Sequence, residues 1–138
     1  METGPGPLDA ALTAVGDRWT LLLVEALLPG PARFGDLQAA LPGIAPTVLS
    51  QRLRQLEERS LVVATPYSER PLRYVYELAA PARELAAPLR LLADWAVRHR
   101  DAEPLRHVAC GTALEATLWC PTCEAPVADD ATSDLHWA

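Results

Sequence analysis

The sequence of 138 residues contains no lysine, so arginine supplies all 12 of its basic side chains. No apolar run reaches the roughly 18 residues of a membrane span, and no transmembrane helix is expected. No arginine precedes Arg18, which argues against a secretory signal peptide and favours a cytoplasmic location. The chain also lacks a glycine-rich phosphate loop and a nucleophile–base pair, so an enzymatic function is not expected.

The net charge of −6 is unevenly distributed along the chain. Residues 1–100 hold 11 arginines and 11 acidic residues, whereas residues 101–138 hold one arginine and seven acidic residues. From Arg33 to Arg73 there are six arginines and four acidic residues, a local charge of +2. Nucleic-acid affinity follows the charge of one surface rather than the total, so the acidic tail does not exclude a DNA-binding body. Because +2 is a small charge, strong binding that is independent of salt is not expected.

Apolar periodicity predicts several short helices, then a β-hairpin, then a last helix. Helices are expected at residues 8–15, 18–28, 34–41, 46–59 and 81–99, and strands at 61–65 and 73–78. Asp17 can cap the second helix, Pro46 suits the first turn of the fourth, and Pro88 should kink the last. The polar connection 67–72 makes the two strands a wing. This order predicts a mainly α fold with a small β-hairpin (α+β), a winged helix-turn-helix.

The helix at 46–59 carries the side chains expected to read DNA. Its polar residues at i, i+3, i+4 and i+7 share the face opposite its leucines. We call this set the reading face: Thr47, Ser50, Gln51 and Arg54, with Arg52 and Gln55 on its flanks. Arginine suits guanine O6 and N7, and glutamine suits adenine N6 and N7. A polar outer face is also the ordinary form of a solvated amphipathic helix, but the helix–turn–helix–hairpin order favours DNA binding.

Three further arginines are expected to contact DNA phosphates rather than bases. They are Arg33, before the third helix, and the wing residues Arg70 and Arg73. Such contacts fix the position of a protein on the duplex without selecting a sequence.

Several motifs resemble the HxlR family of winged-helix regulators. They are VGDRWTLLL at 15–23, RFGDL at 33–37, LPGI at 41–44, VLSQRLRQLE at 48–57, YVYEL at 74–78 and LADW at 92–95. The resemblance covers about residues 8–98, and it is specific because the motifs occur in order at the right spacing. It implies a homodimer built from the first and last helices and bound to a two-fold operator in double-stranded DNA. The half-sites would then lie one helical turn apart, ~34 Å.

The chain departs from the HxlR pattern at several places. Many members carry a cysteine before the first helix, which some use as a redox sensor, but this chain has Pro5-Gly6-Pro7 there. Ala45 and Ala79 replace the Ser and Thr that usually cap the following helices, each at a cost of ~1 kcal/mol. Ser60 replaces the glycine that usually follows the recognition helix, and it suits a left-handed C-cap poorly.

All three cysteines follow residue 100, in the pattern His-x2-Cys-Gly … Cys-Pro-Thr-Cys. The candidate metal ligands are His107, Cys110, Cys120 and Cys123. Each pair has the two-residue spacing of a metal knuckle, and Cys3His is an accepted set for structural Zn²⁺. The pattern predicts a zinc-ribbon-like extension with a hairpin through residues 111–119. A redox role for the CPTC pair and unligated thiols stay open, and His99 or His136 could replace His107 as a ligand.

A regulator of this kind needs an input, and the sequence offers one hint. A small aromatic or drug-like effector could bind in a pocket near the dimer axis. Its expected lining is Trp19, Leu22, Leu23, Leu92 and Trp95, although such side chains are more often simply part of the core. The expected function is a transcriptional repressor that binds a two-fold operator as a homodimer. Alternatives are a zinc- or redox-responsive regulator acting through the Cys/His cluster, and a protein-docking module.

The expected organisation has four parts. They are a flexible N-terminus at 1–7, a winged-helix DNA-binding and dimerisation domain at 8–100, a zinc-ribbon-like extension at 101–127, and an acidic tail at 128–138.

Overall fold

The structure is a computed structural model that describes residues 4–127 and 135. The chain divides into two compact units after Leu89. In the part that the structure describes, no helix is long and apolar enough to cross a membrane. The predicted acidic tail, apart from Leu135, and the alternative ligand His136 lie outside the described residues.

Four helices open the first unit, as the periodicity predicts. They are α1 (Pro7–Val15), α2 (Arg18–Leu27), α3 (Phe34–Ala40) and α4 (Pro46–Glu58). Asp17 caps α2, because its Oδ2 accepts a hydrogen bond from the Thr20 N–H at 3.0 Å. Pro46 occupies the first turn of α4, where its missing N–H leaves no bond unmade. The turn between α3 and α4 uses Gly43 at φ +87, a left-handed conformation that glycine adopts without strain.

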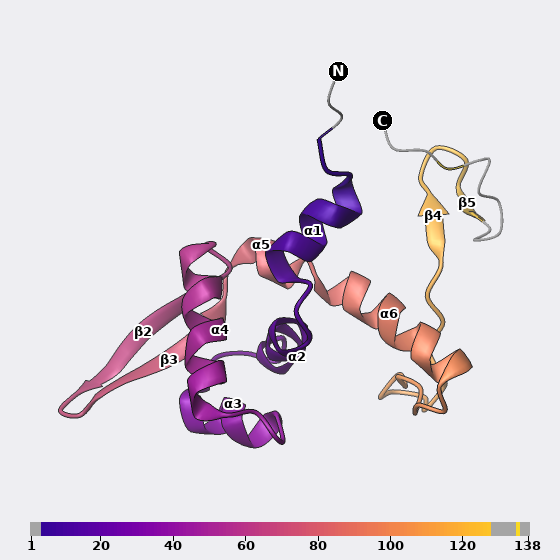
Figure 1. Cartoon of the computed structure of the whole chain (residues 1–138). Helices are drawn as coiled ribbons and strands as arrows, with labels where there is room; N and C mark the ends of the chain where they lie inside the picture. Colours follow the sequence, from indigo (N-terminus) through magenta and orange to yellow (C-terminus); the bar gives the residue numbers. More distant parts are fainter. Residues whose placement is uncertain (1–3, 128–134, 136–138) are drawn as a thin grey trace. The chain divides into compact units, whose positions relative to one another are not determined.

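The wing is longer than predicted and belongs to a three-stranded sheet. Its strands are β2 (Val62–Glu69) and β3 (Leu72–Leu78), so the hairpin includes most of the polar connection 67–72 (Figure 1). The pairing shifts register between Pro66 and Ser68, which accommodates a proline that cannot donate to the ladder. The two residues of β1 (Ala32–Arg33) pair with β3 on its other edge. A strand of two residues has no alternation to detect, so the sequence did not predict β1.

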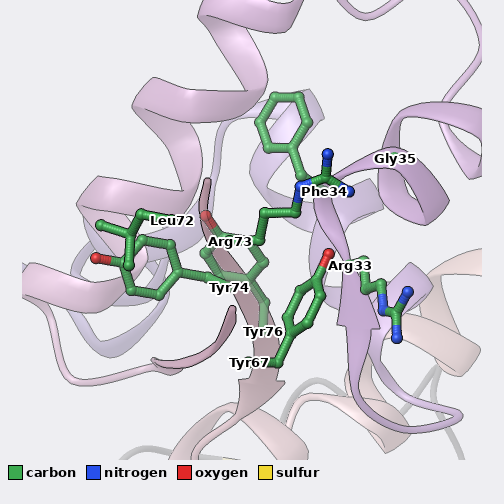
Figure 2. A pocket seen from close by; sticks show the side chains of 8 residues that line it. All are labelled: Arg33, Phe34, Gly35, Tyr67, Leu72, Arg73, Tyr74 and Tyr76. Atoms are coloured by element: carbon green, nitrogen blue, oxygen red, sulfur yellow. The ribbon is translucent and has the colours of Figure 1, made fainter. Parts of the chain in front are cut away.

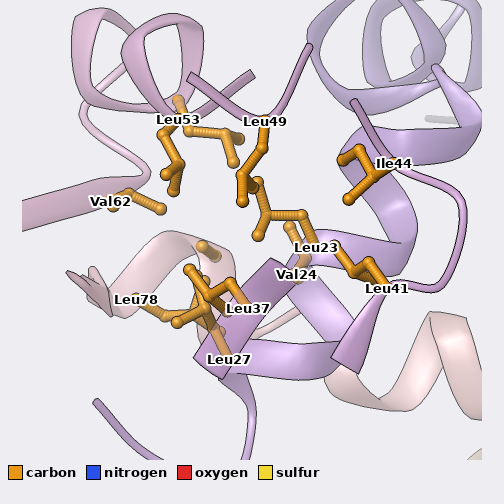
Figure 3. Packing of buried hydrophobic residues seen from close by; sticks show 12 residues of the cluster. Leu23, Val24, Leu27, Leu37, Leu41, Ile44, Leu49, Leu53, Val62 and Leu78 are labelled. Carbon is orange, nitrogen blue, oxygen red and sulfur yellow. The ribbon is translucent and has the colours of Figure 1, made fainter. Parts of the chain in front are cut away.

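The core of the first unit joins α2, α3, α4, the sheet and α5 (Ala80–Arg83). Figure 3 shows α4 leucines packed toward those of α2 and α3, with the inner ends of β2 and β3 beside them. The buried cluster consists of Leu23, Val24, Leu27, Leu37, Leu41, Ile44, Leu49, Leu53, Leu56, Val62, Leu78 and Ala82. This packing fixes α4 on one side and leaves its other side free.

Helix α4 ends in a Schellman motif built around Ser60. The Leu61 N–H donates to the Leu56 oxygen at 2.8 Å, and the Ser60 N–H donates to the Glu57 oxygen at 3.0 Å. Ser60 has φ +58, so a residue with a Cβ occupies the position where glycine is usual. Two side-chain caps are also missing, at Ala45 and Ala79, as the sequence indicates. Leu56 is fully buried, so packing holds the end of α4 in place.

The predicted last helix is two helices, not one kinked helix. After α5, the helix breaks at Glu84 and Leu85, and α6 (Ala86–His99) follows. Pro88 explains the break, because its ring excludes the carbonyl of Glu84 and it has no N–H to donate to that oxygen. The prediction placed the disturbance at Pro88 itself, but the helix is broken one turn earlier.

The C-terminal segment contains two short hairpin-like turns. One closes at the isolated bridge between Arg106 and Ala113. The other joins β4 (Leu118–Cys120) to β5 (Ala125–Val127) in antiparallel pairing. The predicted hairpin through residues 111–119 is therefore wrong in position: the paired strands flank the Cys120–Cys123 spacing instead. The reason is that each two-residue-spaced pair itself forms a tight turn.

Candidate nucleic-acid interface

The four residues of the reading face are all exposed on one side of α4. The opposite side carries Leu49, Leu53 and Leu56, each at most 2% exposed. Because these leucines lock the helix against α2 and the sheet, the reading-face side chains project into solvent from a fixed backbone. Gln55, predicted to flank the reading face, is half-buried. The structure thus places these residues on one exposed face, as their i, i+3, i+4 and i+7 spacing predicts. That each of them contacts DNA stays a prediction.

Arg52, the other predicted flank, already has a partner. Its Nε donates to Asp17 Oδ2 at 2.7 Å, and the Arg52 side chain is only 23% exposed. The Arg52 hydrogen bond is the main cause that lowers the pKa of the Asp17 carboxyl, and the Thr20 N–H acts in the same direction, against partial burial. Asp17 therefore caps α2 and holds α4 at once. This pairing favours a positioning role for Arg52 over a contact with a base.

A second arginine, Arg59 at the C-cap of α4, contacts the end of α1. The Arg59 guanidinium donates to the main-chain oxygen of Ala14, in the last turn of α1. The α1–α2 junction has no spare room, since a Cβ on Gly16 would overlap the Leu12 carbonyl oxygen. Two arginines from α4 thus reach the same corner, formed by the end of α1 and the cap of α2. No local sequence pattern signals either contact, because the partners lie 35 and 45 residues apart.

Two of the three predicted phosphate-binding arginines lie around one open cleft under the wing. Figure 2 shows Arg33 and Arg73 among tyrosines contributed by β2 and β3. The cleft has a volume of about 350 Å³ and is lined by Arg33, Phe34, Gly35, Tyr67, Leu72, Arg73, Tyr74 and Tyr76. The Arg33 guanidinium lies 4.4 Å from the centroid of the Tyr67 ring, a cation–π contact that orients it. The third, Arg70, is exposed at the turn between β2 and β3.

The predicted effector pocket is divided between the two units of the chain. Leu23 is fully buried in the core, and Trp19 and Leu22 are half-buried against it. Leu92 and Trp95 belong to the second unit, where they are 58% and 47% exposed. The Leu23 side chain is therefore core, as the alternative interpretation held, and the effector pocket stays a prediction.

The candidate metal ligands form two separate pairs. Cys110 Sγ lies 3.4 Å from His107 Nδ1. The Thr112 hydroxyl and N–H lower the pKa of the Cys110 thiol. The N–H groups of Cys123 and Thr122, with the Cys123 thiol, lower that of Cys120. Within residues 4–127 and 135, no three metal-binding side chains gather around one point. Zinc binding therefore stays a prediction.

Comparison with known families and sequences is consistent across most of the chain. Residues 14–104 match the HxlR-like helix-turn-helix family. An uncharacterized HTH-type transcriptional regulator of Mycobacterium tuberculosis, Rv3095, is 40% identical over 118 residues, covering 82% of this chain and 74% of the relative.

Comparison with solved structures agrees. The crystal structure of PA1607, described as a candidate transcription factor, matches with a TM-score of 0.79 at 26% identity and covers 99% of this chain and 96% of that one. The reduced form of the redox regulator HypR matches with a TM-score of 0.65 at 26% identity, covering 70% of this chain and 95% of that one. The winged helix-turn-helix fold is thereby confirmed.

Proposed function

The chain belongs to the HxlR-like helix-turn-helix family, whose members are DNA-binding transcriptional regulators and not enzymes, and we propose that it binds a two-fold operator as a homodimeric repressor. The observation that carries the proposal is α4: its apolar side is locked in the core and its polar side is exposed. A helix held in this way fits the major groove, about 12 Å wide, with its side chains directed at base edges.

The roles of the arginines divide between bases and phosphates. Arg54 is exposed on the reading face and is our candidate for bidentate contact with guanine. Arg33 and Arg73, around the wing cleft, are candidates for the flanking phosphates, because an oriented guanidinium pairs well with phosphate oxygens. The tyrosines between them supply a flat apolar wall for the sugar–phosphate backbone.

A second copy of the chain is the proposed partner for apolar surface on two helices. Leu8 and Leu12 on α1 are 66% and 53% exposed, and Leu92 and Trp95 on α6 are exposed to a similar extent. Large apolar side chains that recur along one helix mark a contact surface when they are exposed together. A two-fold dimer would bury the same surface on both copies and would present two reading faces to one operator.

The test replaces Arg54 with alanine and measures affinity for an operator selected from random duplexes by the wild-type protein. Arg54→Ala is expected to weaken binding by about 1–3 kcal/mol, or roughly 5- to 150-fold, and to relax preference at one base pair. Arg83→Ala is the matched control, because that guanidinium pairs with Glu77 at 3.0 Å on an exposed surface. If Arg54→Ala binds as the control does, the assignment of the reading face is wrong.

Arg33→Ala and Arg73→Ala sharpen the same test. Each is expected to weaken binding to all sequences alike and to reduce the slope of log affinity against log salt by about one. A loss confined to one operator sequence would assign these arginines to bases instead. The regulatory sign is tested by a reporter gene placed behind the selected operator, where an activator would raise expression and contradict repression.

A further inference from the structure

We propose that the C-terminal segment holds one Zn²⁺ ion through His107 Nδ1 and the thiolates of Cys110, Cys120 and Cys123. All four ligands lie in the second unit of the chain, whereas α4 and the wing lie in the first, and the proposal does not depend on the operator. Three observations support it: the backbone of the two turns, one distance between donor atoms, and the absence of buried apolar side chains in the described part of the segment.

The two turns share one backbone conformation at the residue after the second ligand. Gly111 follows Cys110 at φ +74, and Glu124 follows Cys123 at φ +50. Positive φ is uncommon for a residue with a side chain, so its presence at Glu124 shows that the turn geometry, not glycine, demands it. In the first turn, the N–H groups of Cys110 and Gly111 both donate to the His107 oxygen, at 3.3 and 2.7 Å. Each pair of candidate ligands therefore spans a turn that is followed by a residue with positive φ.

The distance within the first turn fits two donors of one ion. Tetrahedral zinc with Zn–N of 2.0–2.1 Å and Zn–S of about 2.3 Å places those donor atoms roughly 3.5 Å apart. Cys110 Sγ and His107 Nδ1 are 3.4 Å apart. This distance selects Nδ1 as the nitrogen ligand and leaves Nε2 free to donate elsewhere.

The described part of the segment has no buried apolar side chain to hold its shape. Its strands β4 and β5 have three residues each, and an isolated two-stranded hairpin is marginal in water. Its large apolar side chains are exposed, Trp119 at 59% and Val108 completely. Even so, the match to the PA1607 structure extends over 99% of this chain and so includes the segment. Zinc binding would supply the free energy of folding that a segment without buried apolar side chains cannot obtain from packing.

Each turn is therefore half of a site. Among the described residues no three ligands surround one point, so the ion itself must close the two halves on each other. Three thiols would release their protons to solvent as three Zn–S bonds form. With four protein ligands the ion has no open position, so the site is structural rather than catalytic.

The experiment titrates Co²⁺ and then Zn²⁺ into the reduced full-length chain after chelator treatment. One Co²⁺ per chain is expected, with the visible absorption of a tetrahedral thiolate site, and Zn²⁺ should displace it. Losing an outer partner of a metal ligand costs about 10–100-fold in affinity. Loss of a ligand itself, in His107→Ala, Cys110→Ser or Cys123→Ser, should therefore weaken binding by more than about 100-fold. Glu115→Gln, at an exposed position between the two turns, is the matched control and should bind as the wild type does. His99→Ala tests the alternative nitrogen ligand, and loss of binding in that variant would contradict the assignment to His107.

Three results would overturn the proposal. The first is absence of stoichiometric Co²⁺ or Zn²⁺ binding by the reduced chain. The second is binding that survives His107→Ala and Cys110→Ser, which would leave only the Cys120–Cys123 pair. The third is a Cys120–Cys123 disulfide in the protein as purified without reductant, with no bound metal, which would assign these thiols to redox chemistry.

Discussion

The residues up to Leu89 and those from Arg90 onward are stabilised in different ways. Every buried apolar side chain among the described residues lies in the first region, between Val15 and Ala82. In the second, neither the part of α6 from Arg90 onward nor the strands β4 and β5 contain a buried residue. The first region therefore has its own core, whereas the described part of the second has none. We have proposed a second copy of the chain for α6 and a metal ion for the C-terminal turns.

The largest expected effect comes from Leu53→Ala, in the core of the first region. Leu53 is 2% exposed, and truncation of a buried leucine costs about 2–5 kcal/mol. The measurement is the free energy of unfolding in urea, followed by circular dichroism. The control is Leu118→Ala in β4, which is 42% exposed and should leave that transition unchanged. Equal losses in the two variants would mean that the regions unfold as one.

Trp95→Ala probes the second region. If α6 packs against another copy, loss of this indole should weaken dimerisation by about 2 kcal/mol, or roughly 30-fold. Sedimentation equilibrium measures the dissociation constant, and urea unfolding of the monomer should stay as in wild type. Arg98→Ala, on the same helix, removes only an i,i+4 ion pair with Asp94 and is the control. A wild-type protein that stays monomeric at high concentration would contradict the dimer.

Asp17→Asn tests how the first region holds α4. Asparagine keeps the cap on Thr20, but the charge that pairs with Arg52 is lost. Asp17 is 44% exposed, so solvent screening limits the loss at neutral pH to at most ~1 kcal/mol. Because its pKa is below 3.8 in the folded state, the contribution is complete above 3.8 and is lost as pH falls through the depressed value. The free energies of unfolding of wild type and variant should therefore differ at neutral pH and converge in acid. A difference that stays constant with pH would show that the ion pair is not its cause.

The smallest expected effect is a gain. Ser60→Gly relieves the left-handed conformation at the end of α4, which costs a non-glycine residue about 1–2 kcal/mol. Greater freedom of glycine in the unfolded chain offsets part of this, so a net stabilisation of about 0.5 kcal/mol is expected. Urea unfolding measures it, with Ser60→Ala as the comparison that should gain nothing. A loss of stability in Ser60→Gly would mean that the serine hydroxyl contributes more than the backbone strain costs.

The sequence predicted the helices of the first region well, because the apolar residues that each helix packs into the core recur at helical spacing. It predicted the exposed face of α4 for the same reason. It did not predict β1, whose two residues carry no period, or the helix break at Glu84, where a proline acts on the residue four positions before it. The partner of Arg52 was also missed, because nothing local relates Arg52 to Asp17. The cysteine spacing indicated two turns but not which strands flank them.

Arg52 and Arg59 join α4 to the cap of α2 and to the end of α1. In a dimer that uses α1, the orientation of α1 would then set the distance between the two reading faces. An operator with half-sites ~34 Å apart would bind best when that distance matches its spacing. Anything that tilts α1 would change which spacing fits, without touching a single base-contacting side chain. Operators with one base pair inserted or removed at the centre would therefore report on Arg52 and Arg59 more directly than any change in the recognition sequence.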